Sequence, residues 1–287
     1  MLIIRPSFRK ELLLEKQSKD GFFDAEGFFI FHRDNPMSSI NKNHQSDNID
    51  RSGFAIVIPV YNHGHNVKEV ILKALKLNMP IFVVDDGSND DSYDRIKQIK
   101  HINILRHNVN MGKGAALLTG FAKAAEIADW AVTLDADGQH DPLDAILMIR
   151  GIQSKKRPII VGMRTGMMGP EVPWTSRFGR KFSNFWVRVA GGPFIKDSQS
   201  GFRIYPLPEI LGLKVVAKRF QFEVEALVKA GWKGMPVCEI PVSVNYQQRG
   251  ERISHFRPFI DFVRNSMTFA RLIFQRLLIP QAFRNKW

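Results

Sequence analysis

Two aspartates two positions apart form the part of this sequence best suited to chemistry. Asp135 and Asp137 directly follow the apolar stretch 130–134, which has the composition of a buried strand. Side chains two positions apart on leaving a strand point to the same side. Carboxylate oxygens held in this way suit Mg²⁺ or Mn²⁺, which can bridge the phosphates of a nucleotide. Taken alone, such a pair is more commonly part of a solvated turn, because turns are rich in aspartate.

Short apolar runs alternate with amphipathic stretches from residue 53 onward. We expect strands at 54–60, 81–84, 102–105, 130–134 and 159–162, and helices at 66–77, 91–99, 114–128 and 142–153. This alternation predicts an α/β fold with a largely parallel sheet covered on both faces. Ligands of such sheets bind at the carboxyl ends of the strands, where Tyr61, Asn62, Asp85 and Asp86 also lie.

Five motifs along the chain share an order with a known family. They are VIPVYN at 57–62, VVDDGSND at 83–90, NVNMGKGAAL at 108–117, LDADGQHDP at 134–142 and DSQSGFR at 197–203. In this order they resemble the family 2 glycosyltransferases, and within that family the dolichyl- or polyprenyl-phosphate hexose synthases. The resemblance covers about residues 54–255 and implies a GT-A fold, a Rossmann-like, mostly parallel sheet with helices on both faces. It also implies an inverting, metal-dependent hexosyltransferase.

The resemblance assigns the donor side, a nucleotide-diphosphate sugar, to residues near the ends of the first strands. The matching positions are Pro59, Tyr61, Asn62, Asp85, Asp86, Asn110, Gly112, Lys113 and Asp135. Asp135, Asp137 and Gln139 match the metal ligands, and the Mg²⁺ or Mn²⁺ ion would neutralise the diphosphate leaving group. Glycines that open a helix can also let backbone N–H groups approach an anion, with Lys113 adding charge. An ordinary turn at 85–88 and a plain glycine-rich helix start are the alternatives.

The resemblance assigns the acceptor, a polyprenyl phosphate, to a separate group of residues. The matching positions are Arg164, Arg177, Ser200, Arg203, Arg249 and Ser254. Arginine suits phosphate oxygens because its planar fork donates paired hydrogen bonds, whereas Asp197 is expected to orient the loop. The family pattern ends in Gly-x-Ser-Lys, but here Arg252 and His255 replace the glycine and the lysine. A rival acceptor, a hydroxyl of another membrane lipid or glycan, therefore stays open.

Two glutamates are candidates for catalysis beside Asp137. Glu223 and Glu225 alternate with apolar residues, so both could face one polar cleft if the segment is extended. Transfer to a hydroxyl would require one of them as general base, whereas a phosphate acceptor is already an anion. Charge on a helix surface is the alternative for Glu225.

The flanking segments differ from the central domain in composition. We divide the chain into an N-terminal extension of unknown role at 1–36, a polar linker at 37–52, the glycosyltransferase domain at 53–255 and a basic amphipathic helix at 256–287. In that helix one polar stripe recurs at spacings of four and three, and the other faces are apolar. Its members are Arg257, Asp261, Arg264, Thr268, Arg271 and Gln275. The helix could pack against the domain, or lie in a membrane interface with its arginines toward anionic head groups.

The net charge of +13, from 41 basic and 28 acidic residues, favours an anionic partner. No helix-turn-helix, zinc or RNA-binding signature is visible, so we expect no nucleic acid and instead an anionic membrane surface. No apolar run approaches the roughly 18 residues of a spanning helix, which predicts peripheral or monotopic attachment, at the cytoplasmic face. A catalytically silent membrane scaffold is the rival from another class, and the intact aspartate motifs argue against it.

Overall fold

The computed structural model describes residues 21–23, 29–31, 50–152, 157–165, 174–244 and 258–280. The chain forms two units, Met1–Asn48 and Ile49–Trp287, with a boundary inside the predicted linker. In the first unit, strands β1 (Gly21–Phe23) and β2 (Phe29–Phe31) pair antiparallel. The second unit contains all five motifs.

In the described part of the second unit, seven strands form one mixed sheet in the order β5-β4-β3-β6-β8-β7-β9. The strands are β3 (Phe54–Val60), β4 (Ile81–Asp85), β5 (Asn103–Arg106), β6 (Trp130–Thr133), β7 (Ile159–Arg164), β8 (Arg203–Pro206) and β9 (Val237–Val242). Strands β3 to β6 are parallel, β8 runs antiparallel to both β6 and β7, and β9 is parallel to β7. Because β8 opposes both its neighbours, β7 and β9 end at the same edge as β3, β4 and β6. This confirms the mostly parallel sheet.

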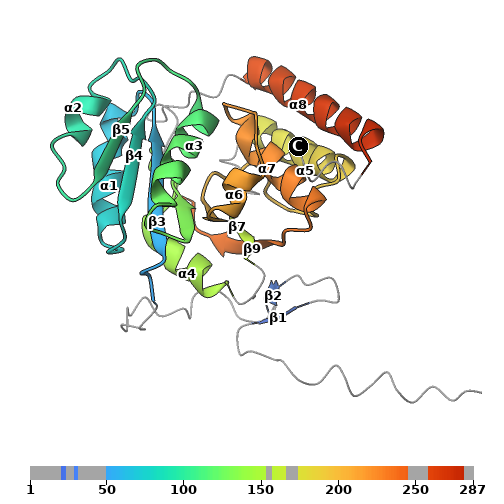
Figure 1. Ribbon diagram of the computed structural model, residues 1–287, viewed down its shortest axis with the longest axis horizontal. Coiled ribbons are helices and arrows are strands. Elements are labelled where there is room, and N and C mark those ends of the chain that lie inside the picture. Colours follow the sequence, from blue (N-terminus) through green and yellow to red (C-terminus); the bar gives the residue numbers. More distant parts are fainter. Residues whose placement is uncertain are drawn as a thin grey trace, which may run out of the picture. The chain divides into compact units, whose positions relative to one another are not determined.

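Helices cover both faces of the sheet (Figure 1). They are α1 (Gly64–Leu75), α2 (Ser92–Ile96), α3 (Lys113–Ala124), the 3₁₀ turn η2 (Pro142–Asp144), α4 (Ala145–Arg150), α5 (Trp174–Val189), α6 (Glu209–Gly212), α7 (Gln221–Trp232) and α8 (Pro258–Leu278). Ile56 and Ile58 of β3 belong to the core beneath α1 and α4, while Ala55 and Val57 belong to the core beneath α3 and α7. The whole of β3 is therefore buried, as its continuous apolar sequence requires.

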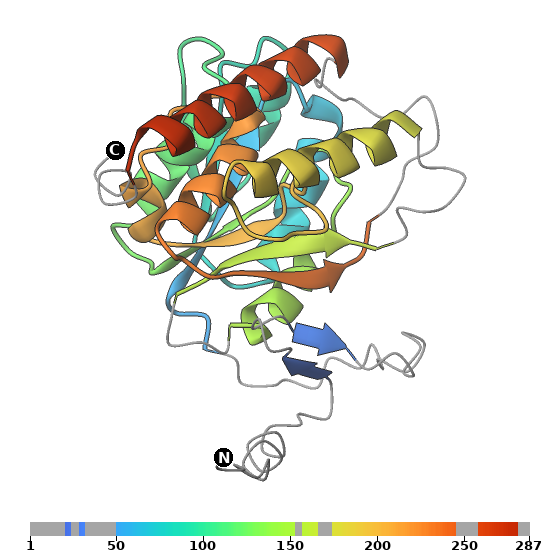
Figure 2. The same cartoon turned by 90° about the vertical axis from the view of Figure 1, so that its right-hand side faces the viewer.

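Helices α5 and α8 form an outer pair on the second face, over α7 (Figures 1 and 2). The ring of Phe182 in α5 lies 4.8 Å from that of Phe262 in α8, and Phe269 of α8 is buried in the core that contains α7. None of the helices in the described ranges is both long and apolar enough to cross a membrane. Helix α8 is thus attached to the domain through one side, and its other side is available for a different contact.

Candidate active site

The loop that follows β6 places Asp135 and Asp137 at the carboxyl edge of the sheet. The backbone N–H of Gln139 donates to Asp137 Oδ1 at 3.0 Å, and Asn66 Nδ2 of α1 donates to the carbonyl of Asp137 at 3.0 Å. Burial raises the pKa of Asp137, and the charge of Asp135 raises it further. The side chain of Asp135 keeps 27% of its surface exposed. An acidic pair is therefore held at the edge, and both of its members are partly exposed.

Lys113 is the cationic centre of this edge. Its Nζ lies 2.6 Å from Asp135 Oδ1 and 2.7 Å from Glu223 Oε1, and we call these three residues the Lys113 cluster. Burial opposes the charge of the lysine, but the two carboxylates outweigh it and raise the pKa of Lys113. Burial likewise opposes ionisation of Asp135, but Lys113 holds the pKa of that carboxyl below its ordinary value. The cluster joins α3, the loop after β6 and α7.

The predicted metal ligands Asp135, Asp137 and Gln139 lie on one short loop. No group of three or more His, Cys, Asp or Glu side chains in the described ranges is placed to hold a metal ion. Gln139 is buried, and its Nε2 has no hydrogen-bond partner within the part of the chain described. Two carboxylates and one amide fit Mg²⁺ or Mn²⁺, because such ions commonly take one or two carboxylates and complete their shell with substrate phosphates and water. The residues present therefore fit the metal.

Asp85 lies at the end of β4, in the predicted nucleoside position. Its Oδ1 accepts a hydrogen bond from the backbone of Ser88 at 3.1 Å, and its Oδ2 lies 3.0 Å from Arg106 Nε. Ser88 Oγ in turn accepts from the backbone of Asn62 at 3.0 Å. These contacts join the ends of β3 and β4, and the predicted residues Tyr61 and Pro59 belong to the same junction.

Asp86 contacts the protein's own backbone. Its carboxylate accepts from the N–H groups of Met111 at 2.9 Å and Gly112 at 2.7 Å, and it lies 2.7 Å from His107 Nδ1. Gly112 has a φ of +103°, and an added Cβ would lie 2.4 Å from the carbonyl oxygen of Lys218. Asp86 therefore shapes the glycine loop before α3, and its nucleoside role remains a prediction.

The amino end of α3 is partly occupied by other protein groups. The N–H of Gly112 bonds to Asp86, and that of Ala115 donates to the carbonyl of Lys218 at 3.0 Å. Asn110 Oδ1 accepts from Arg219 at 3.3 Å. This loop would therefore attract an anion mainly through the charge of Lys113, because several of its backbone N–H groups already bind other protein groups.

Arg164, a predicted acceptor residue, ends β7 at the same edge. Its guanidinium pairs with the buried Asp197 through two contacts of 2.8 Å. Burial opposes ionisation of Asp197, but Arg164 holds the pKa of this carboxyl below its ordinary value. Asp197 therefore orients Arg164. Arg177 follows on α5 and is half-buried.

Arg203, predicted to bind phosphate, is wholly buried. Its guanidinium donates to the carbonyls of Ser200 at 2.7 Å, Ser198 at 2.8 Å and Glu223 at 2.9 Å. Arg203 offers no surface to a ligand, and its role is to hold the 198–203 loop against α7. Ser200 is also buried, and Arg249 and Ser254 lie outside the described residues.

Glu225 does not share a cleft with Glu223. Both lie in helix α7, where side chains two positions apart point to nearly opposite sides. Glu225 is wholly buried, with Arg271 of α8 at 2.6 Å from its Oε2. The backbone N–H groups of Val216 and Ala217 also donate to it. The expected catalytic role of Glu225 is therefore wrong, because its carboxylate joins α7 to α8.

Comparison with known proteins identifies the family. The sequence model described as glycosyl transferase family 2 matches residues 55–206, which contain all five motifs. The chain belongs to this family.

Two relatives of this family 2 chain have a named activity and illustrate the resemblance. The UDP-N-acetylglucosamine--dolichyl-phosphate N-acetylglucosaminyltransferase of Methanococcus voltae is 31% identical over 217 residues, which cover 67% of this chain and 86% of that protein. The dolichol-phosphate mannosyltransferase of Pyrococcus furiosus is 27% identical over 224 residues, covering 74% of this chain and 62% of that protein. The crystal structure of S. aureus TarS 1-349 shares the fold, with a TM-score of 0.50, 16% identity and coverage of 80% and 68% of the two chains.

Two further residues of the family 2 site were not predicted from the sequence. A Cβ at Gly201 would lie 2.4 Å from Asp135 Oδ2 and 2.6 Å from Lys113 Nζ. His140 is buried with its ring 5.3 Å from that of Phe202, and burial lowers its pKa. Both residues belong to the motifs 134–142 and 197–203, but only the fold shows that these motifs meet.

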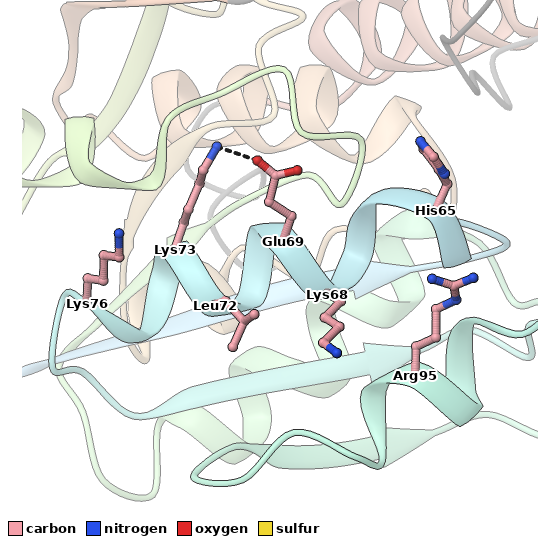
Figure 3. A pocket seen from close by; sticks show the side chains of 7 residues that line it. All are labelled: His65, Lys68, Glu69, Leu72, Lys73, Lys76 and Arg95. Carbon is pink, nitrogen blue, oxygen red and sulfur yellow. Dashed lines mark ion pairs between the residues drawn. The ribbon is translucent and has the colours of Figure 1, made fainter.

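A surface pocket of about 350 Å³ lies away from these motifs, on the exposed side of α1 and on α2 (Figure 3). It is lined by His65, Lys68, Glu69, Leu72, Lys73, Lys76 and Arg95. Lys73 pairs with Glu69, one turn earlier on α1, at 2.7 Å. None of the predicted site residues lines this pocket, so it is not the candidate active site.

Proposed function

We propose that this family 2 glycosyltransferase moves a hexose from a nucleotide-diphosphate sugar to a polyprenyl phosphate, with inversion at the anomeric carbon. The reaction takes place at a membrane surface, on the cytoplasmic side, and needs Mg²⁺ or Mn²⁺. The supporting observation is the combination of an acidic, lysine-containing edge with an apolar helix face that points outward from the same domain.

On the donor side, the residues at the edge suit a sugar diphosphate. A divalent ion on Asp135, Asp137 and Gln139 would neutralise the charge that develops on the diphosphate as its bond to the sugar breaks. Burial and the charge of Asp135 raise the pKa of Asp137, and a cation bound there would oppose both effects. Lys113 adds a second positive charge directly beside Asp135. The protein thus supplies charge where the leaving group departs.

On the acceptor side, no general base is needed for a phosphate, which is already anionic at neutral pH. Arg164 ends β7 at the same edge as Asp135, because β7 runs parallel to β6. Its guanidinium is held in a fixed direction by Asp197. We propose that Arg164 attracts the anionic acceptor. Glu223 serves as base only if the acceptor is a hydroxyl.

The orientation of α8 supports a lipid partner. Asp261 of the polar stripe is 2% exposed, whereas Phe259, Phe274 and Leu277 are 79%, 64% and 77% exposed. Arg271, expected to face lipid head groups, instead contacts Glu225 inside the domain. Much of the apolar surface of α8 therefore faces outward, although Phe269 and Leu272 are buried. A protein surface rarely exposes a large apolar patch without a partner. We propose that this outward surface lies in the membrane interface.

The relatives support the same acceptor class. Both activities named above act on a dolichyl or dolichol phosphate, and they differ in the sugar. Experiment therefore has to identify the sugar that this protein transfers and the nucleobase of its donor.

A transfer assay tests the proposal. The protein is incubated with labelled UDP- and GDP-sugars, Mn²⁺ or Mg²⁺ and a membrane lipid extract, and the lipid product is treated with mild acid. We expect an acid-labile labelled lipid, because a glycosyl phosphate hydrolyses readily. An acid-resistant labelled lipid would instead establish a hydroxyl acceptor with Glu223 as base. No transfer from any donor, together with flotation on anionic vesicles, would favour the silent scaffold.

A further inference from the structure

The ammonium group of Lys113 lies beside the carboxylate predicted to bind metal. The Nζ–Oδ1 distance to Asp135 is 2.6 Å, and the side chains of Lys113 and Glu223 are 15% and 6% exposed. A Mg²⁺ or Mn²⁺ ion on Asp135 Oδ1 would sit about 2.1 Å from that oxygen, which brings it close to the ammonium. Lysine and metal would then compete for the same carboxylate.

The position of Lys113 is set by close packing. The space beside it is filled by Gly201, where an added Cβ would lie 2.6 Å from Nζ and 2.4 Å from Asp135 Oδ2. Glu223 holds the ammonium from the other side at 2.7 Å. The lysine is thus a built-in cation, held between two acids on separate elements.

We infer that Lys113 takes the place of a metal ion beside Asp135 when the donor is absent, so that the divalent cation binds together with the nucleotide diphosphate. The inference rests on the proposed metal-dependent function and concerns the order of binding at that site. The diphosphate supplies the negative charge that lets one site accommodate the ammonium and the divalent ion together. Without the diphosphate, the two cations repel each other in a partly buried environment, where charge is weakly screened.

The coupling between the two ligands provides a readout that does not depend on turnover. Binding of Mn²⁺ is measured by electron paramagnetic resonance of the free ion, with no nucleotide and with UDP or GDP at saturation. A nucleotide that contacts the bound Mn²⁺ raises Mn²⁺ affinity even without any effect of Lys113. The quantity to compare is therefore the gain in Mn²⁺ affinity on adding nucleotide, with and without the lysine. The test variant is Lys113→Gln. Lys123→Gln is the matched control, since Lys123 is an exposed lysine of the same helix that pairs with Glu126.

Without nucleotide, we expect Lys113→Gln to bind Mn²⁺ at least about tenfold more tightly than the wild type, because one neighbouring positive charge is gone. Its further gain in Mn²⁺ affinity on adding nucleotide should be correspondingly smaller than in the wild type. Lys113→Arg, which keeps the charge, and Lys123→Gln should both behave like the wild type.

Two contrary results have different meanings. In the first, Lys113→Gln and the wild type have equal Mn²⁺ affinity without nucleotide, although both bind Mn²⁺ when nucleotide is added. This result would overturn the role of Lys113 and leave the metal requirement standing. Absence of Mn²⁺ binding from the wild type with both nucleotides would overturn the metal requirement and this inference with it. Thermal unfolding of each variant shows that the comparison is made between folded proteins.

Discussion

Replacement of Glu225 by glutamine should destabilise the protein through the contact between α7 and α8. Its carboxylate is wholly buried and lies 2.6 Å from the Arg271 guanidinium and 3.2 Å from Lys229 Nζ. It also accepts from the backbone N–H groups of Val216 and Ala217 at 3.2 and 3.0 Å. The glutamine amide keeps only one acceptor oxygen and directs an N–H₂ group toward these donors.

We expect a loss of about 3 kcal/mol in the free energy of unfolding. Removal of one partner from a buried ion pair costs roughly 3–5 kcal/mol, and the low end applies here. The reason is that the Arg271 side chain is 35% exposed, so water can solvate it after the pair is broken. In a domain of this size the loss corresponds to a decrease in Tm of about 6–12 °C.

Thermal and urea unfolding measure this loss, and Glu223→Gln is the matched control on the same helix. The Lys113 partner of Glu223 keeps Asp135 in that variant, so its loss of stability should be smaller. At a temperature where Glu225→Gln is folded, its transfer rate should stay near the wild-type rate. An unchanged Tm, or loss of transfer by the folded variant, would refute the structural role of Glu225.

Three further predictions concern the site and its supports. Asp137→Asn should abolish transfer without changing the urea unfolding midpoint by more than a small amount, and a retained transfer rate would remove Asp137 from the metal site. Gly201→Ala should lower kcat by about 100-fold, because its Cβ would displace Asp135; unchanged kinetics would show that this edge is loosely packed. Because Arg164 lowers the pKa of Asp197 in the folded state, the stability from this pair is full above the ordinary value of 3.8 and is lost as the pH falls through the lower folded pKa. Asp197→Asn should therefore flatten the dependence of Tm on pH below about 4. If the variant and the wild type lost Tm equally over this pH range, the prediction would be contradicted.

Much of the fold could be predicted from local patterns. The expected strand 54–60 coincides with β3, and the expected helix 66–77 overlaps α1 with a shift of two residues. These elements are readable because a strand buried on both faces is continuously apolar and a covering helix is amphipathic. The expectation of an extended segment around Glu223 was wrong, because alternation over five residues fits a buried helix as well as a strand.

Part of the candidate site could also be predicted from local patterns in the sequence. Asp85 and Asp135 follow strands, so their shared edge is a consequence of parallel topology. The contacts of Arg203 could not be predicted, because a fully buried arginine and a phosphate-binding arginine have the same side chain and differ only in their surroundings.

The sequence by itself therefore determined the order of strands and helices from residue 54 to residue 162, the family, and the edge at which the acidic pair lies. These follow from periodicity and from motifs that are local in the chain. Only the tertiary structure decided which charges meet, because Lys113, Asp135 and Glu223 come from separate elements. It also decided which way α8 faces. A helical period shows that a polar stripe exists, but only the structure shows that Asp261 of this stripe is buried and that Arg271 contacts Glu225, while Phe259, Phe274 and Leu277 are exposed.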